Sequence, residues 1–317
     1  MFRAIALCLF TLLASQPLRA DEVRYYPLPE GSHPGAVAPG SDGRVWFTLP
    51  GQGALGRLDP QTGQVEQVPL GPGAQPEDVL VTTDGAAWVA DRGLNALLRV
   101  DPLRLGVEIF KLPAEAADAG LAALARDHDG RLWFTGTRGW YGRFDPAHGQ
   151  FKVWPAAEGE GPQGITVTPA GDVWYANPRA HALVRVNPAA GLAETLPAAH
   201  PQQSPQRVWS DAQGKLWVSA ADGDSLGHYD PLAREWREWP LPDGATARPH
   251  AVYVDEQDRI WLSDRAGNAL LRFNPFGHDF TPFASDRPGA DVRQLRGRVG
   301  EVWGAETGHD RLVVIRY

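Results

Sequence analysis

One histidine of this sequence could carry acid–base chemistry. His250 lies in the stretch Arg248-Pro249-His250-Ala251. Its imidazole titrates near neutral pH, so it could remove a proton as a general base or hydrogen-bond a polar ligand. Glu306, a second residue of catalytic type, comes three residues after Trp303. A histidine without any chemical role is an equally good interpretation of His250 taken by itself.

Polar residues recur at two positions of a repeating pattern that includes His250. The first position follows a proline at the start of an expected strand, and it holds Gly35, Glu77, Gln163, Gln206 and His250. The second lies three residues after a recurring tryptophan, and it holds Asp91, Gly136, Asn177, Ala220, Asp264 and Glu306.

Such a ring of polar groups could act in two ways. Asp264 and Asp291, with one imidazole, could bind a divalent cation such as Mg²⁺. The same ring could hydrogen-bond a polar ligand without any metal. The residues expected to bind that ligand are Glu77, Asp91, Gln163, Asn177, Gln206, Arg248 and Arg293.

The elements that must position these residues repeat along the chain. Seven tryptophans set the period, with spacings of 41 to 45 residues, and they are Trp46, Trp88, Trp133, Trp174, Trp217, Trp261 and Trp303. Each lies in an alternating run such as Gly43-Arg-Val-Trp-Phe-Thr48, the pattern of a half-buried strand. A second run follows, such as Ala54-Leu-Gly-Arg-Leu-Asp-Pro60, and ends in a turn-forming dipeptide.

Seven units of this kind fill residues 21–317 and leave no second domain. The period predicts an all-β fold, a seven-bladed β-propeller of four-stranded blades. The seventh unit stops after its third strand, Leu312 to Tyr317, and Tyr25-Tyr-Pro-Leu-Pro29 resembles the fourth strands of other units. The N-terminal strand is therefore expected to complete the last blade. We interpret the seven tryptophans and the recurring arginines as packing residues, the arginines being Arg57, Arg99, Arg143, Arg185 and Arg272.

Residues 1–20 have the pattern of a secretory signal peptide, with Arg3 before an apolar run and a small residue, Ala20, at the end. The only cysteine, Cys8, lies in this run, so residues 21–317 offer no disulfide or thiolate chemistry. The net charge of −8 argues against nucleic acid as a partner. We expect a periplasmic or secreted monomer without a membrane span. Motifs of phosphate-binding loops, zinc peptidases and serine hydrolases are absent from the sequence.

The units resemble the streptogramin B (virginiamycin B) lyase family over essentially all of residues 21–317, in motifs such as Asp42-Gly-Arg-Val-Trp-Phe-Thr48. The resemblance implies a propeller that opens the ester of a cyclic depsipeptide by elimination, helped by Mg²⁺. The family site combines Arg-Pro-His in the sixth blade with Glu-Pro-His and a later Glu in the last.

Arg248-Pro249-His250 matches the first element of that site, in the corresponding blade. Asp291-Val292-Arg293 occupies the place of the second, and a guanidinium cannot act as the base. Glu306 lies near the place of the later Glu, one residue out of register.

Because Arg293 stands where the family has its histidine, the preferred interpretation is a binding protein. In that interpretation the channel mouth binds a small polar molecule, a peptide or a partner protein. The alternative is an enzyme, either a Mg²⁺-dependent carbon–oxygen lyase with His250 as base and with Asp264, Asp291 and Glu306 around the metal, or a metal-dependent lactonase. A third interpretation is a scaffold without a ligand.

Overall fold

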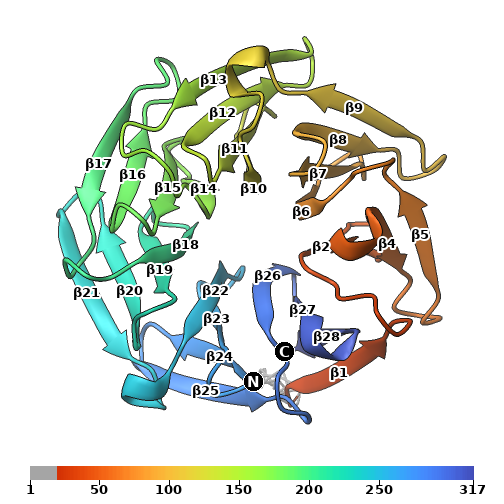
Figure 1. Ribbon diagram of the computed structural model, residues 1–317. Helices are drawn as coiled ribbons and strands as arrows, with labels where there is room; N and C mark the ends of the chain where they lie inside the picture. The colour runs from red at the N-terminus through yellow and green to blue at the C-terminus, as the bar shows by residue number, and fades with distance from the viewer. Residues whose placement is uncertain (1–19) are drawn as a thin grey trace, which may run out of the picture.

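Twenty-eight strands form seven four-stranded antiparallel sheets within residues 20–317, the part of the chain that this computed structural model describes. The expected signal peptide, except for Ala20, lies outside the described residues. The sheets stand around a central channel as the blades of a propeller, which confirms the predicted fold class (Figure 1).

Each blade places one strand at the channel, two in the middle and one at the rim (Figure 1). The inner strands are β2 (Val37–Pro39), β6 (Pro76–Val81), β10 (Leu121–Arg126), β14 (Ile165–Val167), β18 (Pro205–Ser210), β22 (Pro249–Val254) and β26 (Val292–Arg298). The second strands are β3 (Val45–Leu49), β7 (Ala87–Asp91), β11 (Leu132–Gly136), β15 (Val173–Asn177), β19 (Leu216–Ala220), β23 (Ile260–Asp264) and β27 (Glu301–Glu306).

The third strands are β4 (Ala54–Leu58), β8 (Ala96–Val100), β12 (Trp140–Asp145), β16 (Ala182–Val186), β20 (Ser225–Asp230), β24 (Ala269–Asn274) and β28 (Arg311–Arg316). The outer strands are β5 (Val65–Pro69), β9 (Val107–Lys111), β13 (Gln150–Pro155), β17 (Ala193–Pro197), β21 (Glu235–Pro240), β25 (Asp279–Ala284) and β1 (Glu22–Pro27). Four single-turn 3₁₀ helices complete the described elements, namely η1 (Pro50–Gln52), η2 (Ala114–Ala116), η3 (Gly244–Thr246) and η4 (Thr307–His309).

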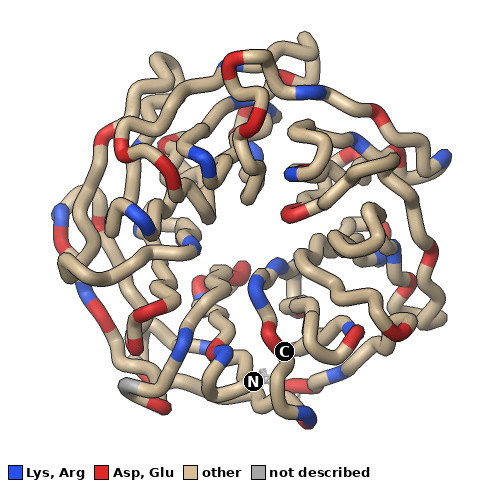
Figure 2. The backbone as a smooth tube through the Cα atoms, viewed as in Figure 1, with Lys and Arg blue, Asp and Glu red and all other residues tan. Residues whose placement is uncertain are grey.

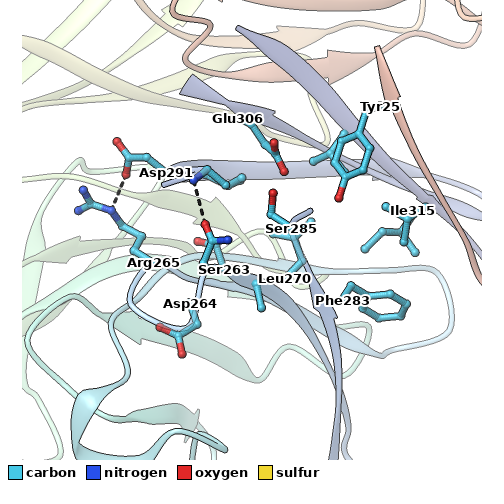
Figure 3. Close-up of a pocket in the computed structure, with 16 residues that line it drawn as sticks. Tyr25, Ser263, Asp264, Arg265, Leu270, Phe283, Ser285, Asp291, Glu306 and Ile315 are labelled. Carbon is cyan, nitrogen blue, oxygen red and sulfur yellow. Dashed lines mark hydrogen bonds and ion pairs between the residues drawn. The ribbon is translucent and has the colours of Figure 1, made fainter. Parts of the chain in front are cut away.

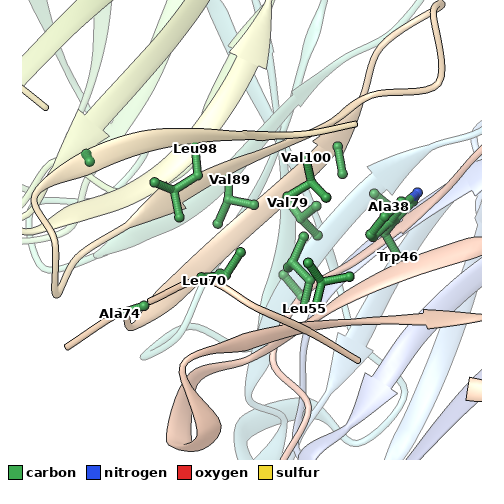
Figure 4. Packing of buried hydrophobic residues seen from close by; sticks show 13 residues of the cluster. Ala38, Trp46, Leu55, Leu70, Ala74, Val79, Val89, Leu98 and Val100 are labelled. Carbon is green, nitrogen blue, oxygen red and sulfur yellow. The ribbon is translucent and has the colours of Figure 1, made fainter. Parts of the chain in front are cut away.

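The hydrophobic core is divided among the interfaces between neighbouring blades. Between the first two blades, Trp46 packs with Leu55, Val79 and Val89 (Figure 4). Every one of the seven recurring tryptophans is at most 4% exposed. Burying such a large aromatic surface at each interface holds adjacent blades together, as the repeat predicted.

The recurring arginines lie opposite these tryptophans in register. Trp133 of β11 pairs with Arg143 of β12, and the guanidinium carbon lies 5.4 Å from the ring centroid. The same cross-strand pair joins Trp46 to Arg57 at 5.2 Å. Such stacking covers the aromatic face with the arginine stem and adds a cation–π attraction, so these arginines belong to the scaffold.

The two ends of the chain meet in the seventh blade. Strand β1 pairs with β28 in an antiparallel register from Glu22 opposite Arg316 to Pro27 opposite Arg311. The sheet order β1-β28-β27-β26 confirms that the N-terminal strand completes the last blade. Among residues 20–317 no helix is long and apolar enough to cross a membrane.

Candidate ligand-binding site at the channel mouth

The first sequence-predicted set lies at one end of the channel, at the start of the inner strands. In every blade one inner-strand residue pairs with the recurring tryptophan, as Tyr253 does with Trp261. The residue three positions before this partner of the tryptophan lies at the equivalent position in each of the seven blades. The resulting ring, called here the mouth ring, consists of Gly35, Glu77, Ala122, Gln163, Gln206, His250 and Arg293.

Most of these positions lie at an irregularity of the strand. The register shifts between Pro249 and Val252 in β22, and between Val292 and Leu295 in β26. Three other inner strands, β6, β10 and β18, have a shift at the corresponding place. A bulge lets consecutive residues leave the regular alternation and re-aims their side chains. The bulges that begin at Pro249 and at Val292 therefore allow the next residues, His250 and Arg293, to reach the mouth.

His250 is held in one tautomer. Its Nδ1 lies 3.0 Å from the carbonyl oxygen of Arg293, which can only accept a hydrogen bond. Nδ1 must then carry the proton, and Nε2 presents a lone pair. Burial and the positive charge of nearby Arg207 lower the pKa of His250 to about 3. The imidazole is thus neutral at physiological pH.

Asp291 lies between two arginines. Arg265 Nε approaches its Oδ1 at 2.5 Å, as Figure 3 shows, and Arg293 donates to its Oδ2 from Nε at 2.9 Å and from Nη2 at 2.7 Å. Burial raises the pKa of Asp291, but the hydrogen bonds and charges of the two arginines outweigh it and lower the pKa overall. The carboxylate stays ionised, and its charge is already neutralised by the protein.

These groups line one open hollow, the mouth cleft. Its volume is about 370 Å³. The residues lining the mouth cleft are Ala221, Arg248, Pro249, His250, Arg265, Ala266, Gly289 and Asp291. Three cationic side chains, counting Arg293 beside Asp291, surround a single carboxylate here. The cleft thus combines a neutral imidazole with an excess of positive charge.

Glu77, Gln163 and Gln206 complete the predicted polar set at the mouth ring. Glu77 forms an ion pair with Arg92 at 3.0 Å, and burial raises the pKa of its carboxyl group. All three side chains are partly exposed. They lie on β6, beside β14 and on β18, and therefore face the channel from other blades than the mouth cleft.

The second predicted set is buried, where the sequence analysis expected it to reach the mouth. Asp91 and Asn177 are fully buried, and Asp264 is 2% exposed. Asp264 accepts the backbone N–H of Arg248 at 2.8 Å, and Asp91 accepts that of Gln75 at 3.0 Å. Arg248 and Gln75 each precede the proline that starts an inner strand. These carboxylates fix the segment leading to the mouth ring, because that segment has N–H groups without a strand partner.

Glu306 is buried at the closure of the ring and does not line the mouth cleft. Arg311 donates from Nε to Glu306 Oε2 at 2.5 Å, and His309 Nδ1 lies 3.0 Å from the same oxygen. Arg311 also bonds Asp286 and lies 3.7 Å from the ring centroid of Tyr25. Glu306 and Tyr25 line a space of about 20 Å³ between blades six and seven (Figure 3). That space is large enough for about one water molecule.

The carboxylates proposed for Mg²⁺ do not fit that ion. Asp291 is bound to two arginines, Asp264 to backbone N–H groups, and Glu306 to Arg311. Each carboxylate is thus already held in place by hydrogen-bond donors of the protein. Within residues 20–317 no three His, Cys, Asp or Glu side chains are grouped so that they could hold a metal. Magnesium dependence stays a prediction of the resemblance, without a ligand set in this arrangement.

Two arginines of the site were missed by the sequence analysis. Arg265 follows Asp264 directly and enters the mouth cleft, and Arg207 follows Gln206 and points into the channel. Both are neighbours of residues that were singled out. For Arg207 the signal that could have found it is the bulge in β18, which brings two successive residues to the channel side, but its place cannot be read from period-2 alternation.

Comparison with known proteins agrees with this architecture. A model of the virginiamycin B lyase family matches residues 21–307. A streptogramin B lyase structure has a TM-score of 0.84 at 22% identity, covering 93% of this chain and 97% of its own. The virginiamycin B lyase of Staphylococcus aureus has a TM-score of 0.85 at 18% identity, with 94% and 99% covered.

Other propellers are also similar. The extracellular domain of a hybrid two-component system from B. thetaiotaomicron has a TM-score of 0.71 at 12% identity, covering 89% of this chain and 40% of that one. Because 1602 solved chains match, similarity of fold does not select an activity. No curated protein sequence matches. The family model covers most of the chain, so this chain belongs to the virginiamycin B lyase family.

Proposed function

We propose that this protein is exported and binds a small polar or peptide ligand in the mouth cleft. One observation carries the proposal: Asp291 is held by Arg265 and Arg293 at the place where the family has a catalytic pair. The guanidinium of Arg293 has no lone pair with which to accept a proton, so the second element of the family site provides recognition in place of chemistry.

The size and charge of the mouth cleft support binding. A volume of about 370 Å³ lies in the range of small-molecule sites. The arginines outnumber the single carboxylate, so a ligand with a carboxylate, such as a peptide C-terminus, fits best. His250 presents one acceptor, Nε2, which suits a ligand N–H or O–H.

Export is supported by two observations. Residues 1–20 have the pattern of a signal peptide. Structural neighbours include extracellular domains of signalling proteins. Mass spectrometry of the N-terminus after expression in a Gram-negative host tests this part: a mature chain beginning at Asp21 supports export, and a retained Met1 in the cytoplasmic fraction contradicts it.

A carbon–oxygen lyase is the second candidate, and the fixed tautomer of His250 favours it. Nε2 could remove the proton α to a carbonyl while the carbon–oxygen bond to a carboxylate breaks, the electron pair of the C–H bond forming the new double bond. A pKa near 3 makes this imidazole a weak base, so turnover would be slow. A solved S. aureus relative, a catalytically inactive histidine-to-alanine variant, is described with quinupristin.

Liquid chromatography with mass spectrometry separates the two candidates. The mature protein is incubated with a streptogramin B, with Mg²⁺ and with chelator, and binding of short peptides is measured by calorimetry. Binding predicts intact streptogramin and tighter binding of peptides with a free C-terminal carboxylate than of their amides. Arg248→Gln should weaken binding about tenfold, a typical cost of one charged hydrogen bond, and His250→Ala, which removes a neutral acceptor, about fivefold.

His148→Ala is the matched control, since His148 is 69% exposed and pairs with Asp145 away from the mouth. It should bind as the unaltered protein does. A linear streptogramin product of unchanged mass that disappears in His250→Ala would overturn the binding proposal and establish the lyase. Equal affinity for peptide acids and amides would overturn the preference for a carboxylate.

A further inference from the structure

A second ring of residues lies one step further into the channel. These residues directly follow the mouth ring in each blade, and they are Ala36, Asp78, Ala123, Gly164, Arg207, Ala251 and Gln294. Four of the seven are alanine or glycine. Three polar side chains, Asp78, Arg207 and Gln294, therefore face the space that the small residues leave open. Basic positions lie on the inner strands β18 and β26 (Figure 2).

Asp78 is fully used by the protein. It is 3% exposed and accepts hydrogen bonds from the backbone N–H of Leu124 at 2.8 Å and from Gln294 Nε2 at 2.5 Å. Its nearest cation is Arg296, whose Nη2 lies 3.4 Å from Oδ2. Arg296 donates to the carbonyl oxygen of Leu124 at 3.1 Å as well. The one carboxylate at this level is thus neutralised by Arg296.

Arg207 has no such partner. It forms no hydrogen bond or ion pair with any side chain or backbone group of residues 20–317, and its Nε is completely buried. Burial lowers the pKa of Arg207. Glu77, the other acid near it, is paired with Arg92 at 3.0 Å. An arginine keeps its proton even when buried. The charges of Asp78 and Glu77 act on Arg207 without bonding to it, so its positive charge inside the channel is only partly compensated.

The position of Arg207 is built by its neighbours. A Cβ added to Gly164 would lie 3.0 Å from Arg207 Cδ and 2.8 Å from its Cα, so glycine leaves room for the arginine stem. Arg296 stands across the same space and has a second buried Nε without a partner. The space enclosed by these side chains holds about 30 Å³, room for about two water-sized species.

We propose that the channel binds a small monovalent anion, of the size of a halide or formate, between the guanidinium groups of Arg207 and Arg296. Both arginines line this space and offer N–H donors, and the alanine and glycine residues on its walls add little bulk. A buried charge without a counter-charge is costly. The anion provides that counter-charge, and the small space excludes bulky anions.

Thermal unfolding in matched salts tests this proposal. The melting temperature is measured in sodium bromide and in sodium gluconate at equal ionic strength, because gluconate is too large for the space. The unaltered protein should melt about 2–5 °C higher in bromide at roughly ten times the dissociation constant, with a saturating dependence on bromide. No difference between bromide and gluconate would overturn the proposal.

Arg207→Met removes the charge and keeps the stem volume. It should lose the bromide effect and melt higher than the unaltered protein in gluconate, since a buried charge without a bonded partner is gone. Arg44→Gln is the control. Arg44 is 43% exposed, so this substitution removes the same charge at the surface. A bromide effect of equal size in Arg207→Met, or its loss in Arg44→Gln, contradicts a site at Arg207.

Crystals of the unaltered protein soaked in bromide provide a direct test that does not depend on a variant folding. An anomalous peak within hydrogen-bonding distance of Arg207 and Arg296 is expected. Peaks confined to surface arginines, with only water in the channel, would overturn the site. This test is independent of the mouth cleft, so it can fail while the proposed ligand binding stands.

Discussion

Arginine has two contrasting environments within the same blades. On the third strands, Arg57 and Arg143 lie over tryptophan rings and bond to backbone oxygens of the next blade. On the inner strand β18, Arg207 has no partner among the described residues. The first kind recurs with the repeat and stabilises it, whereas the second occurs once and interrupts a ring of small residues. The two environments differ in whether the repeat supplies the arginine with a bonded partner.

The largest effect is expected where a buried arginine is fully neutralised. Arg311→Ala would leave Glu306, 2% exposed, without its main cation and remove the contact with Tyr25. Loss of one partner of a buried pair costs about 3–5 kcal/mol of unfolding free energy, measured by urea unfolding. Arg24→Ala, which removes an exposed arginine near Tyr26, should cost less than about 1 kcal/mol. Equal losses in the two variants would erase the contrast between buried and exposed arginines.

A middle-sized effect is expected at the glycine beside Arg207. Gly164→Ala places a methyl group against the arginine Cα and Cδ and should cost about 1–3 kcal/mol. Gly106→Ala is the matched control: a Cβ there has open space, and the substitution should be neutral or stabilising by about 0.4–1 kcal/mol. If Gly164→Ala proved as harmless as Gly106→Ala, the close packing around Arg207 would be disproved.

A smaller, graded effect should separate the scaffold arginines by exposure. Arg57 is 7% exposed and its side chain is neutralised by Glu66, while Arg185 is 46% exposed. Arg57→Ala should cost about 1–2 kcal/mol and Arg185→Ala about 0.5 kcal/mol. Denaturant unfolding of both variants measures the difference. A larger loss for Arg185 would show that burial does not set the scale.

The smallest expected effect is the absence of a titration at His250. Its pKa of about 3 in the folded chain lies below that of an unfolded histidine, about 6.5. The neutral ring therefore contributes stability that is complete above pH 6.5 and is lost as the pH falls toward 3. By NMR, the ring protons should keep neutral-form shifts from pH 8 to pH 5. A midpoint near 6.5 would mean that Arg207 and burial do not act on His250.

The fold could be predicted from the sequence because the patterns that indicate it are local. Trp46 and its six counterparts each lie in an alternating run, and packing repeats them at one place per blade. The closing strand was readable too, since Tyr25 to Pro29 resembles other outer strands. Both inferences needed only periodicity and the rule that a sheet edge seeks a partner.

The site was harder to predict, for a physical reason. Strand periodicity placed Asp264 and Glu306 at strand ends but could not tell which way they point, and unpaired N–H groups and Arg311 hold both inward. At the bulge in β18 two successive residues face the channel, so attention to Gln206 alone missed Arg207. Charge pairing across blades, as between Arg265 and Asp291, depends on contacts that no single repeat encodes.

The pairing of β1 with β28 brings the first and last described strands side by side. A peptide linker joining the two ends would therefore span a short gap, and the chain could be opened at a different blade without changing the ring. The exposed turn at Leu103, 88% exposed between β8 and β9, is a suitable new terminus. Such a circular permutant would have its two ends in the second blade. The four strands of the seventh blade, with Arg311 and Asp291, would then belong to one uninterrupted stretch of chain.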